Sequence, residues 1–141
     1  MPTKINHLFN VRAISAGGMH SGCIDTENKC YTWGSNGYGQ LGIIGAPGAD
    51  KVNFSPRQVM LPPTIGALSP NNSYSVVGGP LLVQSISCGG MHTGAIDLQG
   101  QLWCWGRADS GQIGYATRKL FVPSSRILAG TMVPTPYLVK D

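Results

Sequence analysis

Hydrophobic and polar residues alternate in short runs along most of this chain, and turn-forming residues separate the runs. Alternation with a period of two is typical of β-strands that are buried on one face. The pattern predicts three strands early in the chain and three later: Val11–Ala16, His20–Asp25 and Cys30–Trp33, then Val83–Cys88, His92–Asp97 and Leu102–Trp105. Two segments that begin with proline, Pro56–Val59 and Pro136–Val139, add a last strand to each group, because proline is tolerated at a strand's start or on an edge strand.

A polar turn joins the second and third strands of each group. Asn28 and Gly100 occupy the same place in the two turns, and both residue types tolerate the positive φ of a tight hairpin. A glycine-rich loop, 34–42 or 106–114, follows the third strand. We therefore expect an all-β fold with two antiparallel sheets of four strands.

The two groups are copies of one another. A shift of 72 positions places residues 11–42 on residues 83–114 without a gap. A small sheet has two faces and cannot bury both alone, whereas radial stacking of like sheets buries them. The repeat predicts two blades of a β-propeller, a partial propeller completed by oligomerisation or by the rest of a longer chain. We expect the first blade over 1–61, an inter-blade insertion over 62–82 and the second blade over 83–141.

The framework of each copy resembles a known repeat. It begins Val-x-x-Ile-x-x-Gly-x-x-His, continues to a hairpin that ends in Trp-Gly, and closes with Gly-Gln-Leu-Gly and Pro-x-x-Val. This pattern is similar to the repeat of the regulator of chromosome condensation family, with Ile113 the one departure in the second Gly-Gln loop. The structural motif comprises Gly17, Gly18, His20, Trp33, Gly34, Gly39, Gln40 and Gly42, and Gly89, Gly90, His92, Trp105, Gly106, Gly111, Gln112 and Gly114.

The resemblance implies a function without chemistry of its own. Members of that family typically form seven-bladed propellers that serve as interaction platforms, so we expect a non-catalytic scaffold that binds protein partners or associates with itself through blade edges. Guanine-nucleotide exchange on a small GTPase, the role of the founding member, is a second hypothesis. A structural subunit of an extracellular or virion-like surface is a third, suggested by low charge and high glycine content. The fold does not choose among them.

Composition adds limits on partners. Hydrophobic residues make up 42% of the chain and charged residues 11%, which argues against disorder and against a helical bundle with a charged surface. The ten Lys and Arg side chains are scattered, so a net charge of +4 indicates a slightly basic surface and argues against nucleic-acid binding. No apolar run approaches the ~20 residues that span a bilayer, so we expect no membrane insertion. The N-terminus lacks the apolar core of a secretory signal, which favours an intracellular chain over an exported one.

Candidate catalytic and metal-binding groups have structural interpretations. His20 and His92 share one framework position beside a glycine pair, where we expect the imidazole to bond to backbone. Asp25 and Asp97 precede the hairpin turns, where Asp commonly accepts hydrogen bonds from nearby backbone N–H groups. The four cysteines form no C-x-x-C pair and predict buried free thiols. We therefore expect no enzymatic activity, no cofactor and no metal site.

Positions that differ between the copies are better candidates for recognition. In the glycine-rich loops, residues 35–38 align with residues 107–110, and loops on a rigid scaffold commonly carry function. Tyr and Arg are enriched among interface anchors, so we predict that Tyr38, Arg107 and Asp109 contact a protein partner. Segments 43–55, 62–82 and 115–134 are predicted insertions, and 62–82 is a candidate to reach a neighbouring subunit.

Overall fold

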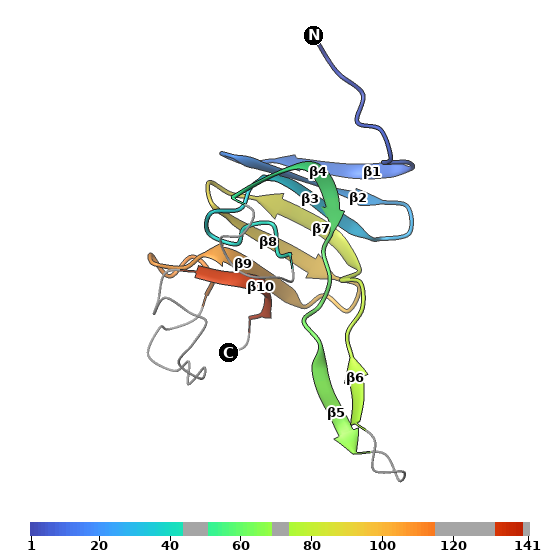
Figure 1. The fold of residues 1–141 in the computed structure, drawn as a ribbon, viewed down its shortest axis with the longest axis vertical. Helices are drawn as coiled ribbons and strands as arrows, with labels where there is room; N and C mark the ends of the chain where they lie inside the picture. The colour runs from blue at the N-terminus through green and yellow to red at the C-terminus, as the bar shows by residue number, and fades with distance from the viewer. Residues whose placement is uncertain (44–50, 69–73, 115–131, 140–141) are drawn as a thin grey trace.

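The computed structural model describes residues 1–43, 51–68, 74–114 and 132–139, and strands are the regular elements of this part of the chain (Figure 1). Two sheets have four strands each, and all neighbouring strands are antiparallel. The predicted all-β fold with two four-stranded blades is therefore confirmed. The first sheet runs in the order β1 (Val11–Ala16), β2 (His20–Asp25), β3 (Cys30–Ser35) and β4 (Val52–Gln58). The second repeats that order with β7 (Val83–Cys88), β8 (His92–Asp97), β9 (Leu102–Arg107) and β10 (Met132–Leu138).

Each sheet contains a tight hairpin between its second and third strands. Asn28 has φ 65° and Gly100 has φ 82°, as the two turns were predicted to require. Asp25 Oδ1 accepts hydrogen bonds from two backbone N–H groups of its turn at 2.9 and 3.0 Å. Asp97 Oδ1 accepts the matching pair at 2.9 and 2.8 Å. Both carboxylates thus have the structural role expected from the sequence.

Four strands extend beyond their predicted limits. β3 and β9 each run two residues past their tryptophan, because the backbone continues to pair with the outer strand beyond a bulge. The outer strands begin at Val52 and Met132, four residues before the prolines that signalled them. The predicted insertions 43–55 and 115–134 were therefore wrong at their C-terminal ends, while residues 44–50 and 115–131 lie outside the described part.

The predicted insertion 62–82 contains a hairpin of its own. β5 (Thr64–Leu68) and β6 (Tyr74–Val77) pair as a two-stranded antiparallel sheet that projects away from the two blades (Figure 1). Backbone hydrogen bonds close its base, from Leu61 N to Gly79 O at 2.8 Å and from Leu81 N to Val59 O at 3.1 Å. The chain therefore returns from this hairpin directly into the second blade.

The main core lies between the two sheets. Ile24, Cys30 and Val59 of the first blade pack against Val83, Ala95 and Trp105 of the second, with Leu81 among them. We call the sheet face that carries Ile24 and Cys30 the back face of the first blade, and the face that carries Val83, Ala95 and Trp105 the front face of the second. Packing of a back face on a front face is how neighbouring blades bury the surface that one sheet leaves open. The described residues include no helix that is both long and apolar enough to cross a lipid bilayer.

The backbones of the two blades contact one another at their glycine pairs. Gly18 N donates a hydrogen bond to Gly89 O at 3.0 Å, and a Cβ atom on Gly17 would overlap the same carbonyl oxygen. The Gly-Gly sequence therefore allows backbone of one blade to contact backbone of the next.

Candidate protein-interaction surface

The loop 34–42 joins the two blades through one backbone carbonyl. Gln40 O accepts a hydrogen bond from Thr93 Oγ1 at 2.7 Å and a second from Trp105 Nε1 at 2.9 Å. The Gln40 side chain forms hydrogen bonds within its own loop. Its Oε1 accepts a hydrogen bond from Tyr38 N at 2.9 Å, and its Nε2 donates one to Ser35 Oγ at 3.2 Å. The glutamine therefore shapes the loop with its amide and contacts the next blade with its backbone.

His20 belongs to the same contact. Its Nε2 lies 2.8 Å from Thr93 Oγ1. Because that hydroxyl already donates its proton to Gln40 O, it accepts from His20, and the neutral imidazole carries its proton on Nε2. His20 Nδ1 is buried without a hydrogen-bond partner. The expected bond to backbone was wrong for this ring, because the neighbouring blade supplies a threonine at the position that the imidazole reaches.

Burial sets the protonation of His20. Desolvation is the main cause that lowers the pKa of His20 below its ordinary value, and the charge of nearby His92 lowers it further. His92 itself lies against Gly89, where a Cβ atom would come within 2.8 Å of the imidazole Nδ1. Both histidines therefore sit beside glycine, and the described residues include no cluster of three or more His, Cys, Asp or Glu side chains that could hold a metal ion.

The remaining framework residues occupy matching places. Trp105 is fully buried between the blades, whereas Trp33 is half-buried on the front face of the first blade. Gln112 repeats the role of Gln40 within its own loop, and its Oε1 accepts from Ser110 N at 2.8 Å. Positive φ angles recur in the two glycine-rich loops, at Gly34, Gly39, Gly42, Gly106, Gly111 and Gly114.

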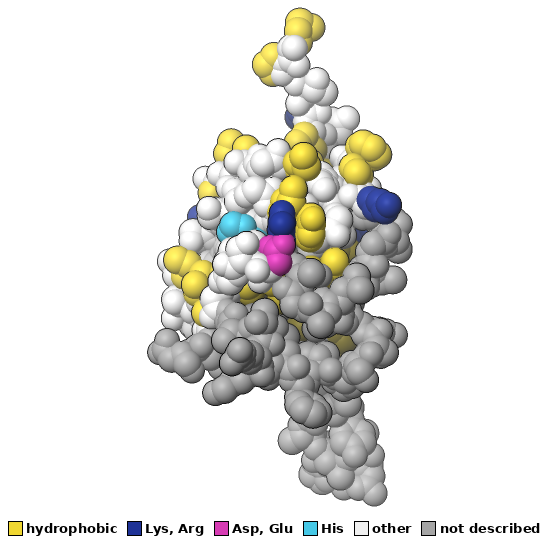
Figure 2. All heavy atoms as spheres, turned by 90° about the vertical axis from the view of Figure 1, so that its left-hand side faces the viewer, with side chains coloured by type: hydrophobic (Ala, Val, Ile, Leu, Met, Phe, Trp, Pro, Cys, Tyr) yellow, Lys and Arg dark blue, Asp and Glu magenta, His cyan; other side chains and the backbone are white. Residues whose placement is uncertain are grey.

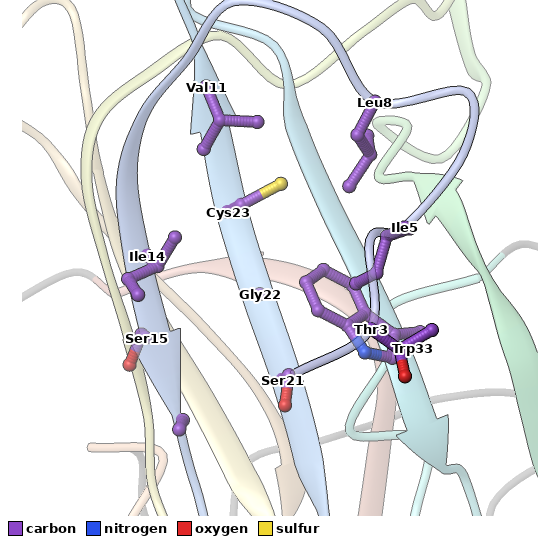
Figure 3. Close-up of a pocket in the computed structure, with 11 residues that line it drawn as sticks. Thr3, Ile5, Leu8, Val11, Ile14, Ser15, Ser21, Gly22, Cys23 and Trp33 are labelled. Atoms are coloured by element: carbon purple, nitrogen blue, oxygen red, sulfur yellow. The ribbon is translucent and has the colours of Figure 1, made fainter. Parts of the chain in front are cut away.

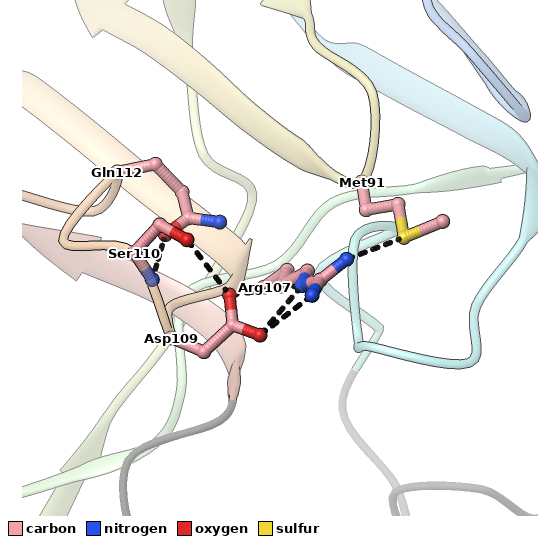
Figure 4. A network of polar contacts seen from close by, with 5 residues as sticks. All are labelled: Met91, Arg107, Asp109, Ser110 and Gln112. Atoms are coloured by element: carbon pink, nitrogen blue, oxygen red, sulfur yellow. Dashed lines mark hydrogen bonds and ion pairs between the residues drawn. The ribbon is translucent and has the colours of Figure 1, made fainter.

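The structure brings the three predicted recognition residues together. Arg107 Cζ lies 5.0 Å from the centroid of the Tyr38 ring, within cation–π range, although the two side chains come from different blades. Arg107 also forms an ion pair with Asp109, with Nη2 and Oδ2 2.7 Å apart (Figure 4). We call Tyr38, Arg107 and Asp109 the interface triplet. The triplet is partly exposed and bridges the glycine-rich loops of both blades.

Electrostatics and a thioether fix the guanidinium of Arg107. The hydrogen bonds from Arg107 hold the pKa of Asp109 below its ordinary value, and the same contacts raise the pKa of Arg107. Arg107 Nη1 lies 3.6 Å from Met91 Sδ (Figure 4). In addition, Arg107 N donates a hydrogen bond to Met91 O at 2.9 Å. Sequence reasoning did not single out Met91 as a contact, because it is identical in both copies and only one copy carries the arginine.

The side of the molecule shown in Figure 2 carries few charged side chains among the described residues. On this side of the molecule apolar side chains lie around a contact between acidic and basic groups, with a histidine nearby (Figure 2). Met19, which follows the first glycine pair, is 63% exposed. Exposed apolar side chains, an oriented arginine and a tyrosine are each typical of protein interfaces.

The thiols contribute no reactive group. All four cysteines are buried and free, as predicted. Burial raises the pKa of Cys30 to about 12 and that of Cys23 to about 11. Because the thiolate is the nucleophile and the metal ligand, these side chains remain protonated packing groups at neutral pH.

A further inter-blade contact that the sequence interpretation did not include involves Arg12. Arg12 donates to Asn28 Oδ1 at 2.9 Å, to Val83 O at 3.0 Å and to Gln84 O at 3.2 Å, so its guanidinium bridges β1 and β7. A signal was available, because Arg12 aligns with Gln84 and is one of the positions at which the two copies differ.

The geometry agrees with the family models that match the sequence. A model described as the regulator of chromosome condensation (RCC1) repeat matches residues 27–96, and a second model of that description matches residues 11–40 and 83–112. Together these matches cover residues 11–112, which include all four strands of the first blade and three of the second. The chain belongs to the RCC1 repeat family. The resemblance found in the sequence is therefore confirmed, and the second model divides the chain at the same 72-residue spacing.

Relatives and solved structures extend this assignment. The chain is 32% identical over 124 residues to Protein RCC1 of Candida albicans, covering 88% of this chain and 24% of that protein. It is 31% identical over 116 residues to the ultraviolet-B receptor UVR8 of Arabidopsis thaliana, covering 81% and 22%. The crystal structure of Prp20p from Saccharomyces cerevisiae superposes with a TM-score of 0.69 at 23% identity, covering 96% of this chain and 28% of that one. The chain thus spans about a quarter of the length of these proteins, and the last comparison shows the propeller fold.

Proposed function

We propose that this chain is a non-catalytic interaction scaffold, with residues 1–61 and 83–141 as two propeller blades and 62–82 as an insertion between them. In this proposal the interface triplet contacts a protein partner. The rest of the repeat framework has a structural role, because it holds the two glycine-rich loops at fixed positions relative to one another.

One observation carries the proposal: Tyr38 and Arg107 come from different blades and stack on one another at a partly exposed position. Asp109 and Met91 hold the guanidinium in place, so a partner would meet an arginine that has already lost much of its rotational freedom. Pre-ordered side chains lower the entropic cost of binding. The two positions also differ between the copies, as expected for residues that the blade framework does not require.

A photo-crosslinking experiment tests the surface. A photoreactive phenylalanine analogue in place of Tyr38 should crosslink a discrete protein in the cells that produce this chain. The same analogue in place of Phe54, which is 90% exposed on β4, supplies the background. No crosslinked protein at position 38 above the background at position 54 would contradict the proposal.

Substitution of the arginine gives a second readout of the same contact. Arg107→Ala should weaken binding of the crosslinked protein by at least about tenfold, as loss of an interface anchor does. Arg57→Ala removes the same charge from exposed outer strand β4 and should leave binding unchanged. Equal effects of the two substitutions would indicate a contribution from net charge alone.

Guanine-nucleotide exchange is a second candidate, and similarity to Protein RCC1 favours it. The structure of Prp20p is described together with binding to Gsp1p and histones. Under this alternative the partner is a small GTPase. Addition of the chain to a small GTPase loaded with a fluorescent guanine nucleotide should then accelerate nucleotide release, and an unchanged release rate would dismiss the alternative.

A further inference from the structure

The first blade presents an uncovered front face. Val11 and Ile14 on β1 are 40% and 80% exposed, whereas their counterparts on β7, Val83 and Ile86, are fully and partly buried against the first blade. Val11, Ile14 and Trp33 line a pocket of about 380 Å³ over this face (Figure 3). An apolar sheet face that one blade buries is therefore accessible on the other.

The second blade presents an uncovered back face. Ile24 and Cys30 of the first blade are fully buried, while the aligned Ile96 and Leu102 are 39% and 44% exposed. The loops differ in the same sense. Gly39 and Gly42 are buried on the second blade, and Gly111 and Gly114 are exposed. The chain therefore carries both halves of a contact that it already makes once internally.

The open front face also carries the donors of that contact. In the internal contact, Thr93 Oγ1 on β8 and Trp105 Nε1 on β9 both donate to Gln40 O. Ser21 on β2 and Trp33 on β3 occupy the aligned positions and line the pocket (Figure 3). Serine and tryptophan supply the same two donor types, one hydroxyl and one indole N–H. The pocket thus has two groups that can donate hydrogen bonds to a backbone carbonyl of a Gly-Gln loop.

The exposed loop has the backbone shape of the docked one. Gly111 and Gly114 have φ angles of 76° and 77°, close to the 73° and 66° of Gly39 and Gly42. The Gln112 amide accepts from Ser110 N as Gln40 accepts from Tyr38 N. The carbonyl of Gln112 is therefore held in a loop of the same geometry as the carbonyl that docks on Thr93 and Trp105.

We propose that copies of this chain associate head to tail, the back face of the second blade packing on the front face of the first blade of another copy. Gln112 O then accepts hydrogen bonds from Ser21 Oγ and Trp33 Nε1 of the other copy. This inference deepens the proposed scaffold function, on which it rests. Such a contact uses two different surfaces, so association continues until a ring closes or a filament grows.

The N-terminal segment lies at the edge of this pocket. Thr3, Ile5 and Leu8 line it on the side of Trp33 (Figure 3). Ile5 is still 40% exposed, so the segment covers the face only in part. The incoming loop enters beside this segment or replaces it.

Two charge substitutions test the head-to-tail geometry. Ile14→Glu blocks the front face and Leu102→Glu blocks the back face. In sedimentation at increasing concentration the unsubstituted chain should form species larger than a monomer, and each variant alone should stay monomeric. A mixture of the two variants should form a one-to-one dimer, because the intact back face of one meets the intact front face of the other.

Other outcomes overturn the inference. If the unsubstituted chain stays monomeric up to millimolar concentration, the head-to-tail inference is wrong. It is also wrong if the Leu102→Glu variant still dimerises, because that variant could dimerise only through a contact that does not use the back face, such as front face to front face. Phe54→Glu adds the same charge on exposed β4 and should leave association unchanged. Trp33→Phe retains the ring and removes the indole donor, so it should weaken association about fivefold, the effect of one lost hydrogen bond.

The proposal of self-association and the proposal of a partner-binding triplet can be disproved independently. Tyr38→Ala removes an anchor of the interface triplet but neither the front face nor the 111–114 loop, so association between copies should persist. If copies of the chain associate but no protein crosslinks at position 38, only the proposal that the interface triplet binds a partner is disproved.

Discussion

His20 makes the contact between the blades sensitive to pH. Its Nε2–H is used by Thr93, and its Nδ1 is buried without a partner. Protonation would place a second N–H donor and a charge at a site where Nδ1 has nothing to donate to, and where the charge of His92 is repulsive. The folded chain therefore favours the neutral ring.

The sign of the effect follows from the lowered pKa of His20. The unfolded chain binds a proton on this ring below about pH 6.5, and the folded chain does so only at lower pH. Stability is thus fully present above the unfolded-state pKa and is lost as the pH falls toward the folded-state pKa, by up to about 1.4 kcal/mol per pH unit. Denaturant unfolding of His20→Gln should show a weaker pH dependence between pH 7 and the folded-state pKa than the unsubstituted chain.

A matched histidine provides the control for this measurement. His7 is exposed in the N-terminal segment, so His7→Gln should keep the pH dependence of the unsubstituted chain. If His20→Gln followed the same pH curve as the unsubstituted chain, the buried imidazole would not be the group responsible.

At the scale of elements, the glycine-rich loops need glycine for two reasons: a positive φ angle and close contact with the next blade. Gly39 and Gly111 have nearly equal φ angles of 73° and 76°. A Cβ atom at Gly39 would overlap Pro134 of β10, whereas a Cβ atom at Gly111 would have nothing within 4 Å. The pair therefore separates the cost of the left-handed conformation from the cost of crowding between blades.

Alanine at the two glycines should give unequal losses of stability. Gly111→Ala should cost about 1–2 kcal/mol, the penalty of a left-handed conformation for a residue with a Cβ. Gly39→Ala should cost about 1–3 kcal/mol more, because the added methyl group crowds a packed contact. Chemical denaturation of both variants measures the difference, and equal losses would mean that β10 moves aside without cost.

The alignment of the two copies made most elements predictable, and pairing between strands decided the rest. Val11–Ala16 and five further strands began where the repeat placed them. The outer strands began earlier, since Val52 and Met132 are selected by partners across a bulge and carry no local signal of their own. The hairpin at 64–77 depends on folded neighbours in the same way. The partners of Arg12 do so too, although the difference between the copies at this position marked the residue.

The candidate surface was foreseeable in its residues and not in its geometry. Tyr38, Arg107 and Asp109 were selected because the copies differ there. Their proximity depends on the packing of one blade on the other, which places the two loops on one side of the molecule. Comparison of the two copies shows which residues differ, whereas predicting a contact between blades requires knowledge of how the blades are oriented relative to one another.

For the whole molecule, the main core belongs to both blades at once. Leu81 is 2% exposed and packs among residues of the two sheets. Since a sheet of this size buries one face on its neighbour, we expect the blades to unfold as one cooperative unit. Local stability should therefore be similar in β2 and β8.

Truncation of Leu81 tests this cooperativity. Leu81→Ala should destabilise the chain by about 2–5 kcal/mol through the cavity that it leaves. Hydrogen exchange followed by mass spectrometry should show equal loss of protection in peptides that cover β2 and β8. Loss confined to β8 would show that the first blade has an independent stability.

The use of a main-chain oxygen at Gln40 has a consequence for how such proteins change during evolution. Every amino acid supplies that oxygen, so this contact depends on the shape of the loop and on its donors, Thr93 and Trp105, and not on a side-chain acceptor at position 40. A blade can then change the side chains of this loop without a paired mutation at the two donors, as long as the loop keeps its shape. A chimaera with residues 106–114 in place of residues 34–42 should accordingly fold and retain burial of Trp105. Its fluorescence measures this burial once Trp33 and Trp103 are replaced by Phe, and an unfolded chimaera would show that adjacent blades are individually matched.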